Sequence, residues 1–427
     1  MRSAWRVILL ALAATLMLAN AARATDRGRL LHNFSSMRDG ANPAAGLLLD
    51  AAGNLYGTAF SGGATSGCYN NDGCGVVFEL SPMGGEEWKW SVLYTFTGGN
   101  DGGGSFAGLL MDAAGNLYGT TRFGGTHNWG TVFKLSPTTG GKWTETVLYS
   151  FCSVPNCVDG GDPWSSLVFD SAGNLYGTTY AGGDVTECNS LQIGCGVVFK
   201  LTPGAGGWRE TVLHGFRGRD GASPVAGVAI DSAGNLYGTT LYGGIYGDGV
   251  VFELAPTPGG WEWTVIHNFA DREDGANPAA AVILDSAGNL YGTTYSGGDV
   301  DKCGGITLGC GVVFELTPPT PTTPTSGGHW TETRLHVFTG GPDGGNPQAP
   351  LAFDAAGNLY GTTARGVIFE LTLTSRRWTE LVLHTFTSPD GGIPTAGLTV
   401  DLEGNLYSTT YYGGEHGYGM VYELIPK

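Results

Sequence analysis

One short motif, which occurs seven times, constrains this chain more than any other feature. It reads Asp-x-x-Gly-Asn-Leu-Tyr, and most copies continue with Gly-Thr-Thr and a Gly-Gly pair. The copies begin at Asp50, Asp112, Asp170, Asp231, Asp285, Asp354 and Asp401. Successive copies start roughly 50 to 70 residues apart, which is close to the period of a β-propeller blade. One repeated unit therefore fills nearly all of the 427 residues.

Each unit contains four strand-like segments, and no helical period appears after the first residues of the chain. In the fifth unit the segments are residues 280–284, 289–294, 312–316 and 330–338. Gly288 can take the positive φ of a tight hairpin between the first two segments, and Asp-Gly-x-x-Pro turns the chain into the next unit. Four antiparallel strands per unit are typical of a propeller blade. The predicted fold is all-β, a single seven-bladed β-propeller.

The two ends of the chain predict how the ring closes. The last unit stops after residues 421–424 and lacks its fourth strand, whereas residues 29–34 match that strand. We therefore expect the N-terminal strand to complete the seventh blade and to hide the open sheet edge. The expected blades are 41–97, 102–152, 160–217, 221–270, 275–339, 344–387, and 391–427 together with 27–35.

Residues 1–24 have the pattern of a secretory signal peptide, so the mature domain is expected to be 25–427. Arg2 and Arg6 precede an apolar run at 7–18, and small residues follow at 22–24. The run is too short to span a bilayer. The protein is predicted to be secreted, either extracellular or periplasmic, without membrane insertion.

The eight cysteines form four close pairs along the sequence. An even number of cysteines, local spacing and an oxidising destination favour small disulfide-closed loops over a metal site. No CxxC or matched histidine spacing accompanies them. The predicted disulfides are Cys68–Cys74, Cys152–Cys157, Cys188–Cys195 and Cys303–Cys310.

The charge balance excludes one class of partner. The formal net charge is −17 at pH 7, and loss of the leader with Arg2, Arg6 and Arg23 would make it more negative. Such a surface repels phosphate backbones, so no nucleic-acid partner is expected. The expected partner is an extracellular polysaccharide or protein, bound by a monomer.

The repeat also resembles a known family. Gly-Asn-Leu-Tyr-Gly-Thr-Thr, followed by Gly-Gly and by Gly-Val-Val-Phe-Glu-Leu, is similar to the GloVer tandem repeat of exported bacterial proteins, over nearly the whole mature chain. The resemblance implies an exported repeat protein without an agreed biochemical activity. Members often carry a C-terminal anchoring signal. None is seen here, and release is the expectation.

The repeated polar residues are best explained by structure. The Asp of each motif should cap its own hairpin. A second set of carboxylates begins the Asp-Gly turns at Asp39, Asp101, Asp159, Asp220, Asp274, Asp343 and Asp390. Turn formation is again expected. A ring of carboxylates could also bind calcium, and no other cofactor is predicted. Whether there is a metal site stays unknown.

The repeated aromatic residues are also interpreted as packing positions. Five histidines share one repeat position, which tyrosines fill in other units; they are His32, His214, His267, His336 and His384, with Tyr94 and Tyr149. A position that accepts either residue suits a packed strand better than a ligand. The recurring Trp88, Trp143, Trp208, Trp261, Trp330 and Trp378 should likewise cover blade edges.

Function is expected where the repetition breaks. The loop between second and third strands is long and cysteine-bearing in units one, three and five, and nearly absent in unit six, so unit six would be the low side of a cleft. Non-repeated side chains decorate these loops. The candidate catalytic residues are His127, Arg365, Glu415, His416 and Tyr418, and the candidate ligand-binding residues are Trp129, Trp164, Tyr246 and Asp248.

Three functions remain open at this point, and a structural surface protein is the least favoured of them. The high symmetry and the lack of a catalytic signature favour a binding scaffold for an extracellular glycan or protein on the loop-rich face. The alternative is a polysaccharide-active enzyme, a lyase or glycoside hydrolase, with a histidine, tyrosine or carboxylate pair acting near unit six. No nucleophile elbow, phosphate loop or zinc signature is present.

Overall fold

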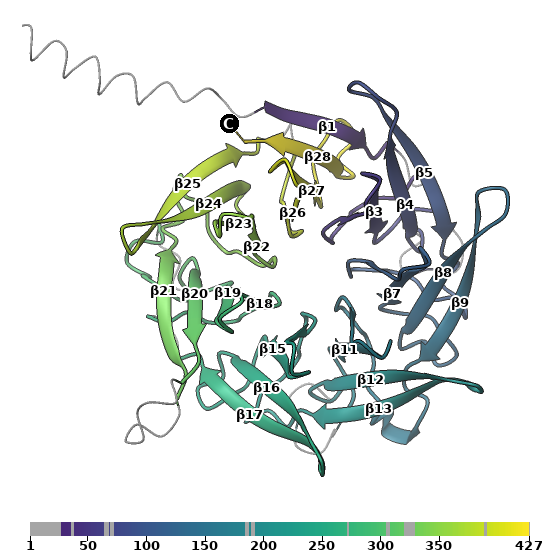
Figure 1. The fold of residues 1–427 in the computed structure, drawn as a ribbon, viewed down its shortest axis with the longest axis horizontal. Coiled ribbons are helices and arrows are strands. Elements are labelled where there is room, and N and C mark those ends of the chain that lie inside the picture. Colours follow the sequence, from purple (N-terminus) through teal and green to yellow (C-terminus); the bar gives the residue numbers. More distant parts are fainter. Residues whose placement is uncertain are drawn as a thin grey trace, which may run out of the picture.

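The computed structural model shows a ring of seven four-stranded antiparallel sheets (Figure 1). The described residues are 27–35, 38–63, 68, 72–183, 188, 193–270, 273–304, 308–319, 329–387 and 391–426. The predicted leader, residues 1–24, lies outside them. Within this part of the chain the helical element is a single 3-10 turn, η2 (Pro155–Cys157). The predicted all-β, seven-bladed propeller is confirmed.

The two inner strands of each blade are short. The innermost strands of blades one to seven are β2 (Leu48–Leu49), β6 (Leu110–Met111), β10 (Val168–Phe169), β14 (Ala229–Ile230), β18 (Ile283–Leu284), β22 (Ala352–Phe353) and β26 (Thr399–Val400). The second strands, which carry Leu-Tyr-Gly-Thr-Thr or a close variant, are β3 (Leu55–Ala59), β7 (Leu117–Thr121), β11 (Leu175–Thr179), β15 (Leu236–Thr240), β19 (Leu290–Thr294), β23 (Leu359–Thr363) and β27 (Leu406–Thr410).

The two outer strands are longer, and apolar residues of the third strands pack between blades together with those of the second strands. The third strands are β4 (Val76–Pro82), β8 (Thr131–Thr138), β12 (Val197–Gly204), β16 (Val250–Thr257), β20 (Val312–Thr317), β24 (Val367–Thr374) and β28 (Met420–Ile425). The fourth strands are β5 (Trp88–Thr95), β9 (Lys142–Ser150), β13 (Gly207–Gly215), β17 (Gly260–Asn268), β21 (Thr331–Val337), β25 (Arg377–Thr385) and β1 (Arg27–Asn33).

The N-terminal strand closes the ring, as the sequence predicts. β1 pairs antiparallel with β28, with Arg27 opposite Ile425 and Asn33 opposite Met420. The Arg29 guanidinium also donates to the Glu423 carboxylate at 3.2 Å. Blade seven therefore takes its outer strand from the other end of the chain, and β28 does not remain an open edge.

The motif aspartate caps its own hairpin in every blade. In blade three the Asp170 carboxylate accepts from the backbone N–H groups of Ala172 and Asn174, both at 2.9 Å, from the Asn174 amide at 2.6 Å and from the Tyr176 hydroxyl at 3.0 Å. Partial burial works to raise the pKa of Asp170, but these hydrogen bonds outweigh it and hold the pKa below its usual value. The carboxylate therefore belongs to the fold.

The Gly-Thr-Thr part of the motif ties neighbouring blades together. The first threonine donates to a backbone carbonyl on the inner part of the next blade, as Thr178 does to Ala226 at 2.8 Å. The same contact recurs around the ring from Thr58, Thr120, Thr239, Thr293, Thr362 and Thr409. The Thr409 hydroxyl donates to Ala45 in blade one, so the set of hydrogen bonds spans the closure as well.

A recurring contact also joins the outer strands of adjacent blades. The fourth-strand residue that lies opposite the third-strand leucine, which we call the seam position, faces the His or Tyr of the preceding blade. At the seam between blades seven and one, Trp90 stacks on His32 with ring centroids 3.7 Å apart, and Trp263 stacks on His214 in the same way. In four other blades the seam position holds a glutamate: Glu145, Glu210, Glu332 and Glu380.

The seam glutamates are partly buried beside other carboxylates. Burial, and secondarily the charge of Asp101, raises the pKa of Glu145 to about 7. Burial with Asp159 does the same for Glu210, and burial with Asp343 for Glu380. Burial also lowers the pKa of His32, although Asp39 opposes that shift. The seams therefore hold groups whose charge changes near neutral pH.

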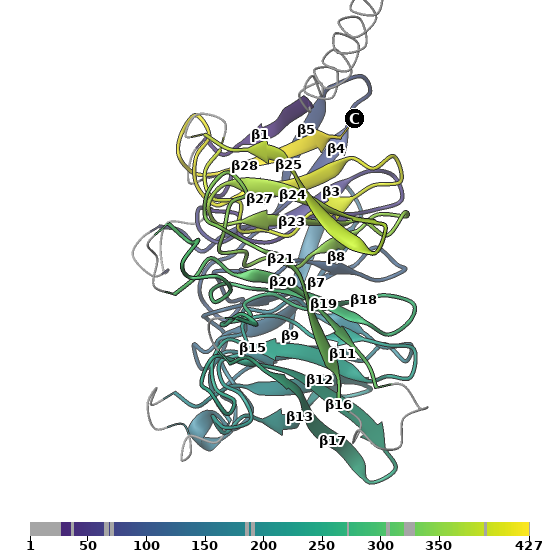
Figure 2. The ribbon, with the colours of Figure 1, turned by 90° about the vertical axis from the view of Figure 1, so that its left-hand side faces the viewer.

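The connections at one end of the blades form a common loop face. The turn into each blade pairs with the loop that follows its second strand, for example Ala41 with Ser61 and Ala222 with Tyr242. Figure 2 shows the ring edge-on, with these loops gathered on one side and the hairpins between third and fourth strands on the other. The four predicted disulfides, which lie on these connections, are all present.

Removal of the closing strand should prevent folding. A mature protein that lacks residues 25–36 would expose the whole edge of β28, and we expect it to be insoluble or to associate. Size-exclusion chromatography with circular dichroism checks this result. A monomeric truncation with an unchanged melting transition would contradict the closed ring.

Loss of one inter-blade hydrogen bond should destabilise the ring. Thr178→Val keeps the shape of the side chain but leaves the buried Ala226 carbonyl without its donor, which should lower the free energy of unfolding by about 1–3 kcal/mol. Thr257→Val, on an exposed hairpin, is the matched control and should change it by less than about 0.5 kcal/mol. Urea denaturation measures both; equal effects would contradict the role of Thr178.

Stability should depend on pH through the seam glutamates. Because their folded-state pKa of about 7 lies above the unfolded value, they favour folding when protonated, and this contribution is lost as the pH rises through 7. Replacing Glu145, Glu210 and Glu380 with Gln should therefore raise the melting temperature at pH 8, by on the order of 2–4 °C, and leave it nearly unchanged at pH 4.5. Glu145 and Glu210 face Tyr94 and Tyr149, so no histidine titrates at the equivalent position of those two seams. An equal shift at both pH values would contradict the assignment.

Candidate functional site

Two rings of side chains surround the loop-face end of the central channel, which we call the channel mouth. One ring comes from the turn into each blade and consists of Ala44, Phe106, Trp164, Val225, Ala279, Gln348 and Thr395. The other follows the second strand of each blade and consists of Phe60, Arg122, Tyr180, Leu241, Tyr295, Ala364 and Tyr411. The backbone positions repeat, but the side chains do not. The mouth is therefore the place where the ring loses its symmetry.

Blades seven, one, two and three fill their side of the mouth with packed aromatic rings. Phe106 is at the centre of this group, with ring centroids 4.3 Å from Phe60, 5.4 Å from Trp164 and 6.3 Å from Tyr411. Trp164 in turn stacks near Tyr180 at 5.3 Å. Contacts of this kind rigidify the group because aromatic pairs have preferred geometries. One wall of the mouth is thus a fixed aromatic surface.

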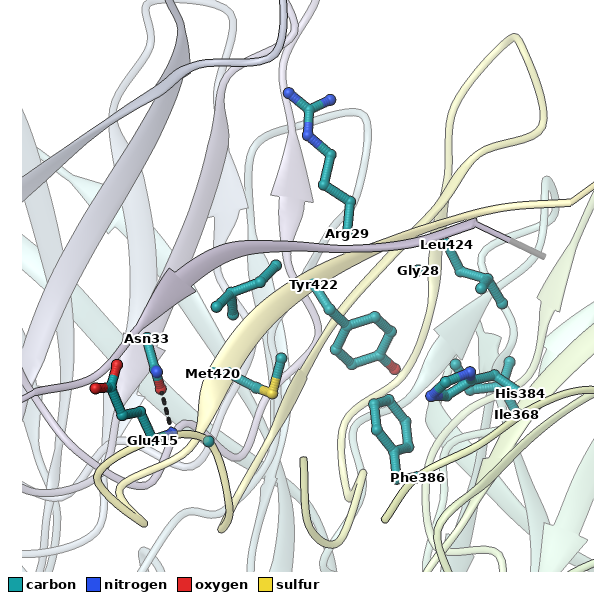
Figure 3. A pocket seen from close by; sticks show the side chains of 12 residues that line it. Gly28, Arg29, Asn33, Ile368, His384, Phe386, Glu415, Met420, Tyr422 and Leu424 are labelled. Atoms are coloured by element: carbon teal, nitrogen blue, oxygen red, sulfur yellow. Dashed lines mark hydrogen bonds between the residues drawn. The ribbon is translucent and has the colours of Figure 1, made fainter. Parts of the chain in front are cut away.

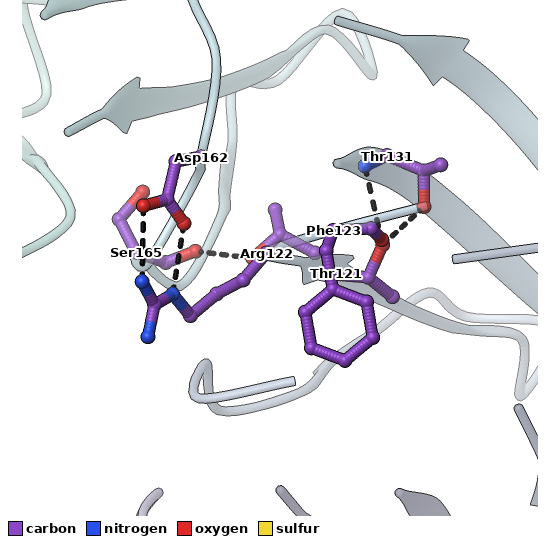
Figure 4. Close-up of polar contacts among 7 residues, drawn as sticks. Thr121, Arg122, Phe123, Thr131, Asp162 and Ser165 are labelled. Atoms are coloured by element: carbon purple, nitrogen blue, oxygen red, sulfur yellow. Dashed lines mark hydrogen bonds and ion pairs between the residues drawn. The ribbon is translucent and has the colours of Figure 1, made fainter. Parts of the chain in front are cut away.

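Arg122 is held within this aromatic wall. Its guanidinium donates twice to the Asp162 carboxylate, at 2.8 and 3.0 Å (Figure 4), and lies 3.9 Å from the centroid of the Trp164 ring. In blade five, Asn277 stands where Asp162 stands in blade three, and its amide donates to the Leu241 carbonyl instead. The pair Arg122–Asp162 is a local departure from the repeat, and the two charges compensate each other.

The opposite side of the mouth, at blades four to six, is hollow. Smaller residues at the ring positions leave a pocket of about 690 Å³, walled on one side by Phe106, Trp164 and Tyr411. Tyr242 and Tyr295 stand on its other side and are 45% and 40% exposed. The described lining contains no aspartate, glutamate or histidine. The pocket is therefore aromatic and uncharged.

Polar atoms at the mouth remain without partners inside the protein. The Trp164 Nε1 and the Thr395 Oγ1 are buried and make no hydrogen bond to any described residue. Both residues line the pocket. Because a buried donor without a partner costs roughly 1–3 kcal/mol, these two atoms mark positions where a bound molecule would add stability.

The low side predicted at blade six is present as a separate hollow. A pocket of about 370 Å³ is lined by Arg365, Phe386, Ile393 and Tyr412, among others. The Arg365 guanidinium donates to the Asn346 side-chain oxygen at 3.2 Å and to the Gly340 carbonyl at 2.7 Å. Arg365 therefore holds the turn into blade six in place.

The other candidate catalytic residues are distributed over separate loops. His127 is exposed on the blade-two loop, and Glu415, His416 and Tyr418 share the blade-seven loop. Glu415 lines a pocket between blades six and seven, and Arg365 lines the hollow just described. Acid–base chemistry needs its groups within hydrogen-bond reach of one substrate. Catalytic roles for these residues stay predictions.

Of the four candidate ligand-binding residues, Trp164 lies at the channel mouth. Tyr246 is 62% exposed on the blade-four loop, outside the described lining. The Asp248 carbonyl accepts from the Asn277 N–H at 2.7 Å, which fixes the loop to the next turn. Trp129 is half-buried and packs over Gly161, where a side chain would collide with its ring. Trp129 and Asp248 therefore also hold the loops in place.

Sequence reasoning missed most of the mouth. Phe106, Arg122, Asp162 and Tyr411 do not stand out in the sequence, because they occupy repeat positions and look like part of the pattern. The signal that could have found them is a comparison of the copies at each position, since Arg122 stands where other units have Phe, Tyr, Leu or Ala.

The turn carboxylates, considered above for calcium, are engaged with their own blades. The Asp159 carboxylate accepts from the Tyr149 hydroxyl at 2.8 Å and from the Ser153 N–H at 2.7 Å. His214 pairs with Asp220 at 2.8 Å. Asp390 lies outside the described residues. In the described part of the chain, no three His, Cys, Asp or Glu side chains are grouped as metal ligands, and no helix there has the length and apolarity of a membrane span.

Known structures share the architecture at low sequence identity. The extracellular domain of a putative one-component system of B. thetaiotaomicron aligns with a TM-score of 0.54 and 11% identity, covering 92% of this chain and 40% of that one. The extracellular domain of a putative hybrid two-component system of the same organism aligns with a TM-score of 0.53 and 13% identity, covering 95% of this chain and 42% of that one. PorZ, a surface component of the type-IX secretion system of Porphyromonas gingivalis, aligns with a TM-score of 0.52 and 14% identity. The alignment covers 90% of this chain and 46% of PorZ.

These likenesses support the fold alone, and this chain spans less than half of each of those proteins. No curated protein sequence matches this chain. One family model does match, over residues 17–190 and 185–422, and it describes the Gloeobacter/Verrucomicrobia repeat. Together the two matches cover nearly the whole propeller. The chain therefore belongs to the Gloeobacter/Verrucomicrobia repeat family.

Proposed function

We propose that this protein is an exported binding scaffold that holds a neutral carbohydrate in the pocket at the channel mouth. The observation that carries the proposal is the composition of the pocket: aromatic side chains with isolated hydrogen-bonding groups and, in the described lining, no carboxylate or imidazole. Sugar rings present apolar C–H faces and a rim of hydroxyls, so they suit exactly such a combination of aromatic surface and single polar groups.

The charges favour a neutral ligand over an anionic one. The chain has a formal net charge of −17, which repels polyanions at long range. The cation at the mouth, Arg122, is already paired with Asp162 at 2.8 Å. An acidic polysaccharide would have to break that pair, whereas a neutral sugar leaves it in place as support for the Trp164 ring.

The pocket composition favours binding over catalysis. A glycosidase needs two carboxyl groups on either side of the bond that it cleaves, and the described lining offers neither. Four disulfides in a chain of this size are typical of an oxidising compartment, which agrees with the expected secretion. The ligand would then be met outside the cytoplasm.

The test is a panel of neutral oligosaccharides measured by isothermal titration calorimetry with the mature protein. Tyr295→Ala should weaken binding about tenfold or more, since an aromatic ring buried on binding contributes about 1.5–3 kcal/mol. Leu308→Ala, at the exposed edge of the pocket, should weaken it less, and Leu373→Ala, which is also exposed but lies on the opposite hairpin face, should leave it unchanged.

Two outcomes would contradict the proposal. One is the absence of binding across the panel by a folded protein. The other is loss of binding in Tyr246→Ala with none in Tyr295→Ala, which would place the ligand on the blade-four loop. New reducing ends in the same reactions would revive the enzymatic alternative.

A further inference from the structure

A second pocket lies at the point where the two ends of the chain meet, on the seam between blades six and seven. It has a volume of about 710 Å³. β1 and β28 line one side with Gly28, Leu30 and Tyr422, and β24 and β25 line the other with Ile368 and His384 (Figure 3). It shares no lining residue with the pocket at the channel mouth. The two sites are therefore independent.

The pocket exists because blade seven lacks a side chain at the seam position. The ladder register places the seam residues opposite the third-strand leucines, and in blades one to six they are Trp90, Glu145, Glu210, Trp263, Glu332 and Glu380. In blade seven the residue opposite Leu424 is Gly28. A Cβ built on Gly28 would meet no atom within 4 Å. A side chain at this position would therefore occupy part of the pocket.

Two other seams show what this volume accommodates. Trp90 and Trp263 each place an indole on the histidine of the preceding blade, with ring centroids 3.7 Å apart and planes within 6° of parallel. His384 is the equivalent histidine of blade six, since it lies opposite Ile368 as His214 lies opposite Val198. The pocket thus has a histidine in the same place as the two seams that contain Trp90 and Trp263. At Gly28, however, no side chain takes the place of the tryptophan.

A second departure from the repeat adds a polar group to the same pocket. Tyr422 occupies the position that is phenylalanine in the other six blades: Phe78, Phe133, Phe199, Phe252, Phe314 and Phe369. It is 4% exposed, and its side chain points toward His384 and Phe386 (Figure 3). Burial raises the pKa of Tyr422, so its hydroxyl stays protonated, and it can donate or accept a hydrogen bond.

The Tyr422 hydroxyl makes no hydrogen bond of ordinary geometry to a described residue. The Ser408 hydroxyl lies close enough to influence it, but donates its own proton to the Gly397 carbonyl at 2.9 Å. A buried hydroxyl without a well-placed partner destabilises the fold, and the six phenylalanines show that the fold does not need it. The hydroxyl therefore points to a ligand.

We propose that the blade six–seven pocket binds a planar aromatic group with a polar atom on its edge. The ring stacks on His384, as Trp90 stacks on His32, and the edge atom hydrogen-bonds the Tyr422 hydroxyl. Indole has this chemistry, whether it comes as a free small molecule or as a tryptophan side chain on a peptide. Residues of both chain ends would contact the ligand, so its binding also strengthens the closure of the ring.

The experiment titrates indole, and separately N-acetyl-tryptophanamide, into the mature protein and follows binding by saturation-transfer NMR. We expect indole to bind with a Kd no weaker than about 1 mM. Tyr422→Phe, which restores the residue of the other blades, should keep the melting temperature and weaken indole about two- to tenfold. Gly28→Trp should fill the pocket, abolish binding and raise the melting temperature, and Gly28→Ala is its matched control with binding nearly unchanged.

The outcomes separate this proposal from the carbohydrate site. Binding of both probes means that the pocket also admits a protein side chain, and binding of indole alone means that it takes small molecules; both support the site. Absence of indole binding by the folded wild-type protein would overturn it, as would undiminished binding by folded Gly28→Trp. Carbohydrate titrations of the same variants should be unaffected, so failure at one site does not count against the other.

Discussion

The hydrogen bond from the first threonine of Gly-Thr-Thr to the next blade is the contact on which the ring depends. Each blade alone is a small sheet with two apolar faces, and it becomes stable only when both faces are covered. The threonine hydroxyl fixes how close neighbouring inner strands lie, and Thr178 to Ala226 at 2.8 Å is typical. The motif glycine before it leaves room for a third-strand phenylalanine, since a side chain on Gly177 would collide with Phe199.

The fold could be predicted because the same sequence motif occurs in every blade. Seven copies of one hairpin, a missing last strand and a matching first strand predict the ring and its closure, and local cysteine spacing predicts the disulfides. The aspartate caps follow from turn chemistry, because the carboxylate of Asp170 meets only residues within six positions of it. Contacts between residues so close along the chain can be predicted from the sequence.

The sites could be predicted only in part. The sequence singles out Trp164 because it stands out beside its turn, and its role in binding stays a prediction. Phe106, Arg122 and Tyr411, which surround it, come from other blades and meet it in the closed ring. The same holds for the seam pocket, which depends on the ladder register that sets Gly28 opposite Leu424. Distances between side chains of different blades depend on the assembled ring. The spacing of residues along the chain therefore does not predict them.

The pairing of β1 with β28 has a consequence for how the protein is made. β1 and β28, the first and the last described strands, are neighbours in space, and Arg29 and Glu423 bond across 394 positions of sequence. Contacts this remote in sequence form late, because a long loop must close first. During synthesis β1 is made before the other strands of the propeller and has no partner until β28 emerges. The chain must therefore carry an unpaired β-segment while the rest of the propeller is made, which makes this the stage of folding most exposed to aggregation.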